Sequence, residues 1–212
     1  MSRHLVLCLA LAAAALPARA EQPHPWSFGE RQSDVLVGWL GGLRPEGSNP
    51  APKGDGIALG IGWERHLSSG LRFGFEFSFY GADYRTPASL SCGAFCVVSS
   101  TMSLNVMGFG PTAGYAAKLG PVELHAGAGF GLYFSTLTAT ASTFGFPGEH
   151  EERDSDLAMD VRAGVGIDVG TSTRLGVELR RLSLEGSFGP LTGGRSIPIG
   201  GDFVLFSYGR RF

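Results

Sequence analysis

The chain has 212 residues, of which 43% are hydrophobic and 33 are glycine, and its formal net charge at pH 7 is −2. A chain of this length fits a single domain, and an all-β barrel of this size is ordinary. The sequence has no run rich in Lys or Arg, so composition and charge argue against a nucleic-acid partner. Beyond the N-terminal region, no stretch approaches the roughly 18 consecutive apolar residues that a membrane-spanning helix needs.

The N-terminal residues have the pattern of a secretory signal peptide. A short basic start precedes an apolar run from Leu5 to Leu16, and Ala18-Arg19-Ala20 is a small-x-small cleavage site. The apolar run is too short to cross a bilayer. We therefore predict a signal peptide at residues 1–20 and one domain at 21–212. Removal of the two arginines in the signal leaves 15 basic residues against 19 acidic ones, a net charge of −4.

The rest of the chain contains eight runs in which apolar and polar residues alternate with a period of two, which is typical of half-buried β-strands. In chain order, these runs predict strands at residues 35–43, 57–66, 71–81, 101–119, 122–136, 157–170, 173–184 and 202–212. In the clearest run, one face carries only large apolar residues: Leu71, Phe73, Phe75, Phe77 and Phe79. Water is a poor solvent for such a face, and lipid is the simplest cover.

Two of these runs contain an irregularity. Pro111 cannot donate a ladder hydrogen bond, so we expect a kink or bulge near the middle of the strand at 101–119. The alternation breaks at Arg180-Arg181, which predicts a bulge in the strand at 173–184.

The connections between the runs alternate between short and long. Tight turns are predicted at 67–70, 120–121 and 170–173, and long polar or Gly- and Pro-rich connections at 43–54, 81–100, 138–156 and 186–201. This rhythm is typical of a closed antiparallel up-and-down transmembrane β-barrel with short periplasmic turns and longer outer loops. A water-soluble eight-stranded barrel would turn its apolar faces inward, and the charges on the opposite faces would make a poor core. We therefore predict an all-β transmembrane barrel of eight strands with both termini on the periplasmic side.

The last predicted strand carries Val204, Phe206, Tyr208 and Phe212 on one face. This segment resembles the C-terminal insertion signal that the barrel assembly machinery reads in Gram-negative outer-membrane proteins, with Arg210 as a departure from the usual pattern. Together with the signal peptide, the eight runs and the turn rhythm, it resembles the small eight-stranded outer-membrane barrels of the OmpA-transmembrane, OmpX and opacity-protein type. The resemblance spans the mature chain and implies location in the cell outer membrane, in contact with lipid and lipopolysaccharide.

Charged residues occupy the faces opposite the apolar ones. The predicted lumen network consists of Glu64, Arg72, Glu76, Glu123, Asp160, Arg162, Asp168 and Glu178, with Arg180 and Arg211 as further candidates. The interior of an eight-stranded barrel is just wide enough for side chains to fill it. Charges buried there must be paired. We therefore predict an internal network of ion pairs that plugs the lumen, with a gated narrow pore as the alternative.

Three further patterns have weaker links to function. Cys92 and Cys96 are predicted to form a disulfide in an outer loop, because the chain would pass through an oxidising periplasm. No cluster suggests a metal site or a cofactor. The acidic run 149–156 is interpreted as a solvated face, with a divalent-cation site as the alternative. His66-x-Ser68 is similar to a motif of lipid A deacylases, but its predicted place at a periplasmic turn does not suit that reaction.

No residue set assembles into a nucleophile, a base and an orienting group, so we predict a non-enzymatic protein. The leading hypothesis is a plugged outer-membrane barrel that acts in envelope integrity or in surface contact and adhesion through its extracellular loops. The first alternative is a narrow pore or a transporter of hydrophobic compounds similar to OmpW. The second alternative is a lipid A-modifying enzyme. The sequence identifies no ligand for the outer loops.

Overall fold

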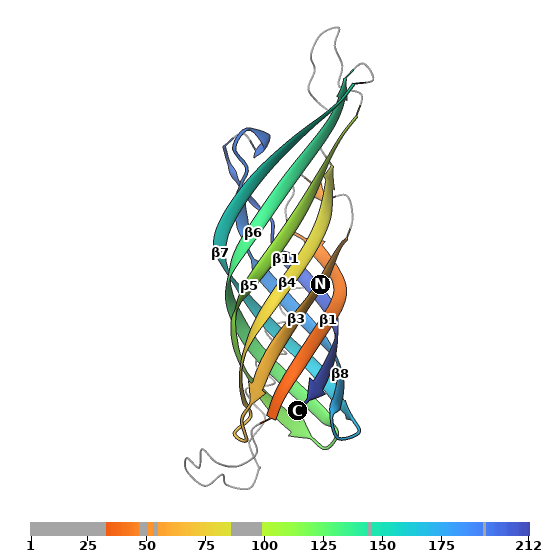
Figure 1. Cartoon of the computed structure of the whole chain (residues 1–212), viewed down its shortest axis with the longest axis vertical. Coiled ribbons are helices and arrows are strands. Elements are labelled where there is room, and N and C mark those ends of the chain that lie inside the picture. The colour runs from red at the N-terminus through yellow and green to blue at the C-terminus, as the bar shows by residue number, and fades with distance from the viewer. Residues whose placement is uncertain (1–32, 47–50, 53–54, 86–98, 144–145, 193) are drawn as a thin grey trace.

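The computed structural model describes residues 33–46, 51–52, 55–85, 99–143, 146–192 and 194–212. Eight long strands form the body of the molecule (Figure 1): β1 (Ser33–Pro45), β3 (Gly56–His66), β4 (Leu71–Arg85), β5 (Ser99–Leu119), β6 (Val122–Thr143), β7 (Phe146–Val169), β8 (Thr173–Ser183) and β11 (Gly201–Arg211). Four short elements complete the fold: β2 (Ala51–Pro52), β9 (Glu185–Ser187), the 3-10 helix η1 (Gly189–Thr192) and β10 (Ser196–Pro198).

The long strands pair in sequence order, and the pairing closes on itself. Each strand is antiparallel to the next along the chain, and β1 pairs with both β3 and β11, so the sheet has no free ends among the eight. At one end of the ring the connections are tight turns, in which Gly70, Gly120 and Gly170 have positive φ values of 89°, 64° and 71°. Such left-handed conformations favour glycine, because it has no Cβ. The predicted eight-stranded antiparallel up-and-down barrel is confirmed.

The two faces of the wall differ as the alternation predicts. Side chains that point outward form an apolar belt, which includes Leu59, Phe75, Phe77, Phe79, Met107, Phe130, Phe134, Leu157, Val161, Val177 and Phe206. Outward rings of β4, β5 and β6 also contact one another, with centroids of Phe77 and Phe109 5.9 Å apart. The residues of the predicted insertion signal lie on this outer face: Val204, Phe206, Tyr208 and Phe212 are 44%, 66%, 50% and 75% exposed.

The prediction of a long loop at 138–156 is wrong. β6 and β7 continue through this segment and pair from Val122↔Ile167 up to Thr143↔Phe146, so they project beyond the other strands (Figure 1). Residues 136–140 combine threonines with apolar residues in alternation, and β-branched residues favour strands. The acidic run 149–156 therefore belongs to β7 and is not a loop.

The two predicted irregularities also need correction. β8 pairs continuously with β7 and β11 through Arg180 and Arg181, so there is no bulge there. Arg180 points inward, while Arg181 points outward and forms ion pairs with Glu46 and Asp202. β5 runs through Pro111 without an inserted residue. Only its ladder with β6 is interrupted, between Phe109↔Leu132 and Thr112↔Gly129.

The connection between β8 and β11 folds back into the barrel mouth. β9 and β10 pair as a small hairpin, and Phe188, Ile197 and Ile199 are buried. The Tyr80 hydroxyl of β4 donates a hydrogen bond to the Ile199 carbonyl oxygen (3.2 Å). We call residues 184–200 the inner loop. A long outer loop was predicted at 186–201. Its apolar side chains instead pack inside the barrel.

Candidate functional site

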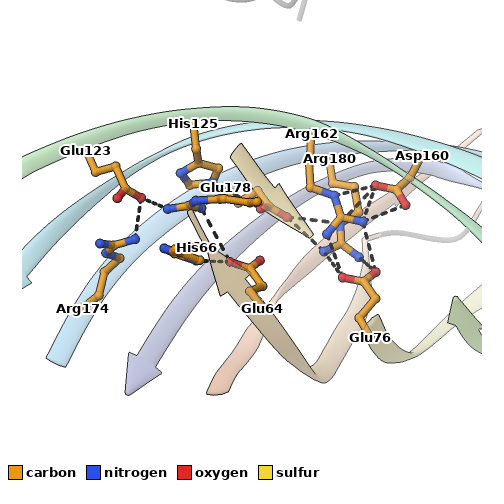
Figure 2. A network of polar contacts seen from close by, with 11 residues as sticks. Glu64, His66, Glu76, Glu123, His125, Asp160, Arg162, Arg174, Glu178 and Arg180 are labelled. Atoms are coloured by element: carbon orange, nitrogen blue, oxygen red, sulfur yellow. Dashed lines mark hydrogen bonds and ion pairs between the residues drawn. The ribbon is translucent and has the colours of Figure 1, made fainter. Parts of the chain in front are cut away.

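The barrel lumen contains the charged residues that the sequence singled out, and Glu76 of β4 lies at the centre of one group. Its carboxylate accepts hydrogen bonds from Arg162 of β7 (2.7 and 3.2 Å) and from Arg180 of β8 (2.6 and 3.1 Å). Each guanidinium uses two nitrogens, the paired geometry that makes arginine–carboxylate contacts strong. Figure 2 shows these side chains converging on Glu76 from different strands.

Two further carboxylates complete this upper group. Asp160 accepts hydrogen bonds from the Arg162 guanidinium at 2.8 and 2.9 Å, and Glu178 accepts them from Arg180 at 3.0 and 3.2 Å. The His125 ring lies 3.3 Å from Glu178 through Nε2. The strands bring these residues together because alternate side chains on a strand point to the same face. Charges from β4, β6, β7 and β8 therefore meet across the lumen.

A second group lies closer to the end with the tight turns. The buried Glu123 carboxylate contacts the guanidinium groups of Arg72 and Arg174. Arg72 also approaches Glu64 at 3.7 Å, and Glu64 lies 2.8 Å from the His66 ring.

At the rim of this end, Asp168 is the shared partner of several cations. Its carboxylate accepts hydrogen bonds from Arg174 (2.8 Å) and from Lys118 (2.9 Å). Arg211 lies 3.6 Å from it. Exposure rises toward this rim, since the Lys118 side chain is 49% exposed whereas Glu123 is 2% exposed. The group around Glu76, the group around Glu123 and the rim around Asp168 together form what we call the charged half of the lumen.

A small cavity with a mixed polar and apolar lining lies within the charged half. Its volume is about 40 Å³, and its lining includes Glu64, His66, Arg72, His125 and Arg174. This is room for a few water molecules at most. Among the lining residues, Glu64, Arg72 and Arg174 take part in the ion pairs described above.

The other half of the lumen is apolar. Inward side chains of the long strands pack there with the inner loop; the buried set includes Leu43, Tyr80, Leu104, Val106, Leu137, Leu182, Phe188, Ile199, Phe203 and Leu205. The Tyr80 and Phe203 rings meet edge to face with centroids 5.3 Å apart. We call this region the apolar half. Trp39 lies at the boundary, where its ring covers the Arg180 guanidinium at 4.7 Å.

All eight residues of the predicted network lie in the charged half, together with Arg180 and Arg211. Sequence reasoning missed Arg174, His66, His125 and Lys118 as members. Arg174 lies on the same face as Glu178, because the two residues are four positions apart in one strand. Alternation in the predicted strand at 173–184 could therefore have identified it. The apolar half was also missed, although Leu43 and Leu205 are inward by the same parity rule.

Other sequence candidates are either separate from this site or outside the described residues. Cys92, Cys96 and the predicted signal peptide at 1–20 lie outside the described residues. Ser68 is exposed in the turn after β3, while His66 points inward to Glu64. In the part of the chain that the structure describes, no group of three or more His, Cys, Asp or Glu side chains is arranged for a metal ion. No helix among these residues is both long and apolar enough to cross a membrane.

The family model of the outer membrane protein beta-barrel domain matches residues 5–212. The chain belongs to this family. Membership implies location in the outer membrane and confirms the predicted resemblance to small outer-membrane barrels. The apolar belt therefore faces the lipid of that membrane.

The chain is also similar to solved structures at low sequence identity. Neisserial surface protein A is 15% identical with a TM-score of 0.53, covering 85% of this chain and 97% of that one. Ail of Yersinia pestis, in complex with a heparin analogue, is 9% identical with a TM-score of 0.46, covering 85% and 98%. The N-terminal barrel of Pseudomonas aeruginosa OprF is 13% identical with a TM-score of 0.39, covering 84% and 97%. No curated protein sequence matches the chain significantly.

Proposed function

We propose that this protein is a non-enzymatic outer-membrane barrel with a plugged lumen that acts in envelope integrity or surface contact through its extracellular segments. The observation that supports the proposal is the packing of inward side chains in two different layers. The charged half is crossed by bonds from Glu76 to Arg162 and Arg180. The apolar half is filled by wall side chains and by the inner loop, in which Phe188 is 1% exposed.

The proposed orientation places the tight turns and both termini in the periplasm and the projecting β6–β7 hairpin outside. Short periplasmic turns and longer extracellular segments are the rule in this class of barrel. The extended hairpin is then the part that reaches farthest from the membrane, which supports a role in contact with other surfaces. A cysteine introduced at Glu149 should react with an impermeant thiol reagent in intact cells. Reaction only after the outer membrane is permeabilised would contradict this orientation.

The surrounding lipid and lipopolysaccharide contact the apolar belt in this proposal, and the barrel assembly machinery contacts β11 during insertion. Val204, Phe206, Tyr208 and Phe212 support the second contact, because they present an apolar outward face. Deletion of Phe212 should lower the amount of heat-modifiable folded protein in the outer membrane. An unchanged amount would count against a role for this residue in insertion.

A non-enzymatic role is supported by the state of the charged groups. The carboxylates of the lumen contact buried arginines, and the cavity beside them has room for only a few water molecules and not for a substrate. The Glu64–His66 pair points into the lumen, whereas lipid substrates would lie on the opposite face of the wall. The charged half therefore suits a structural role.

The alternative function is a narrow pore, favoured by the small cavity in the charged half. Conductance of the refolded protein in planar bilayers separates the two. The parent should stay near background. A variant in which residues 187–197 are replaced by a short Gly/Ser turn should raise conductance only modestly, because the charged half remains closed. Adding Glu76→Ala to that variant should raise it further. Steady conductance by the parent would overturn the plugged barrel and favour the pore.

A further inference from the structure

Above the apolar belt, the outward face of β5 and β6 changes abruptly from apolar to hydroxyl-bearing side chains. We define the hydroxyl face as Thr101, Ser103, Asn105, Thr136, Thr138 and Thr140. The strand register places these residues in three rows, Asn105↔Thr136, Ser103↔Thr138 and Thr101↔Thr140. Their outward direction follows from parity, because Met102, Leu104 and Leu137 between them are buried in the apolar half.

Charged side chains border the hydroxyl face on the β7 side. Arg153, Glu151 and Glu149 stand beside the three rows, opposite Thr136, Thr138 and Thr140. Arg153 donates a hydrogen bond to Glu151 (2.7 Å). Thr101, Asn105 and Thr140 are exposed, and no hydrogen bond between described residues involves a side chain of the hydroxyl face. Neighbouring strands lie about 4.8 Å apart across this face.

The hydroxyl face continues the lipid-facing wall directly. The row below it pairs Met107 with Phe134, both belonging to the apolar belt and about half exposed. A lipid whose acyl chains cover these two side chains must place its headgroup against the rows above. The position therefore points to a lipid headgroup, whereas a polar face isolated from the belt would contact only water.

The height of the hydroxyl face indicates the kind of headgroup. Successive rows are two residues apart, about 7 Å along the strand. With strands tilted by about 40°, each row rises about 5 Å, so the third row stands about 15 Å above the belt. The polar region of a phospholipid leaflet is only about 5–8 Å deep. A phospholipid therefore reaches the first row, whereas the upper rows match a headgroup extended by sugars.

We propose that the hydroxyl face binds the saccharide headgroup of an outer-leaflet glycolipid whose acyl chains cover the adjacent belt. Side-chain hydroxyl and amide groups would exchange hydrogen bonds with sugar hydroxyls, and Arg153 would face the headgroup from the border. The inference rests on the orientation proposed above.

The test uses the full mature protein refolded into phosphatidylglycerol nanodiscs. Rough lipopolysaccharide with its core sugars is titrated in, and the methyl NMR signals of Thr136, Thr138 and Thr140 are followed. These signals should shift and saturate. Replacement of Ser103 by Ala, with Thr136→Val and Thr138→Val, removes three hydroxyls and keeps good strand formers at two of the positions. At about 0.5–1.5 kcal/mol for each hydrogen bond, half-saturation should need about tenfold more glycolipid or more, read from Thr140.

Thr173→Val is the matched control, because this residue lies at the periplasmic end of β8, and it should leave half-saturation unchanged. Lipid A without core sugars should shift only Thr136. An equal response to lipid A would overturn the proposal in favour of a phosphate or acyl contact, and so would equal binding of free core oligosaccharide. Absence of any shift would also overturn it. The labelling of a cysteine at Glu149 in intact cells shows separately whether the orientation, and not this inference, has failed.

Discussion

The two halves of the lumen are built on the same strands but are stabilised by different interactions. β4 contributes Glu76 to the charged half and Tyr80, only two inward positions farther on, to the apolar half. In the charged half, each charged side chain depends on a few specific ion-pair partners. Burying a charge without its counter-ion costs free energy. In the apolar half, contacts are numerous and individually small. Loss of one buried charge should therefore lower the free energy of unfolding strongly. Truncation of a side chain in the apolar half should lower it in proportion to the volume removed.

The largest effect is expected for Glu76→Ala. The substitution leaves Arg162 and Arg180 buried without their main counter-ion, so the free energy of unfolding should fall by about 3–5 kcal/mol. Urea unfolding in lipid vesicles measures this loss. Glu149→Ala on exposed β7 is the control and should change stability by less than about 0.5 kcal/mol. A loss as small as that of the control would show that the charged half is solvated.

The next largest effect separates the inside of the wall from the outside. Phe77 follows Glu76 in β4 and points to the opposite, lipid-facing side of the wall. Phe77→Arg therefore places a guanidinium, which the lumen accommodates, against lipid. An arginine near the bilayer midplane costs about 2–4 kcal/mol of folding free energy. Phe77→Leu, which keeps an apolar side chain, should cost much less in the same vesicle assay. Equal losses for the two variants would contradict the assigned facing.

A smaller, graded effect is expected in the apolar half. Ile199→Val removes one methylene group from a fully buried side chain of the inner loop, and such changes cost about 0.5–1.5 kcal/mol. The unfolding transition should keep its slope with urea while its midpoint moves. If the loss exceeded that of Glu76→Ala, the proposed contrast between the halves would be wrong.

The smallest effect is expected at the rim of the lumen near the tight turns. Lys118 is half exposed and pairs with Asp168 at 2.9 Å. Such exposed pairs contribute about 0.2–1 kcal/mol, because water and salt screen them. Lys118→Ala should therefore lower stability by no more than that, and the difference from the parent should shrink at high salt. A loss comparable to that of Glu76→Ala would show that the pair at the rim is shielded from water as well as the pairs of Glu76 are.

Alternation predicted the strands and their lipid-facing sides, because every second residue of a half-buried strand has the same environment. It also placed Glu76, Arg162 and Glu123 on the inner face. Alternation alone could not give the register, so the specific pairing of Glu76 with two arginines was not predictable. The inner loop was misread because its glycines and prolines are typical of exposed connections, and only the three-dimensional structure shows that Phe188 enters the lumen.

The segment at 138–156 shows a different limit. Its charges favour a loop when each strand is considered alone, since an exposed acidic strand has no apolar face to reveal it. In the barrel, the partner strand supplies the missing signal, because Leu137 packs inside while Glu152 and its neighbours continue the ladder with β6. Pairing between two strands therefore decided a structure that neither strand indicated alone.

The contact between Trp39 and Arg180 has a consequence for assembly. Trp39 belongs to β1 and Arg180 to β8, and β11 lies between these strands in the closed ring. The indole lies over Gly60 of β3, where an added Cβ would come within 2.2 Å of the ring. Trp39 can therefore pack against β3 once β1 and β3 have paired. It contacts the Arg180 guanidinium only after β1 has also paired with β11. Its fluorescence should change at that step, which makes Trp39 an intrinsic reporter of barrel closure.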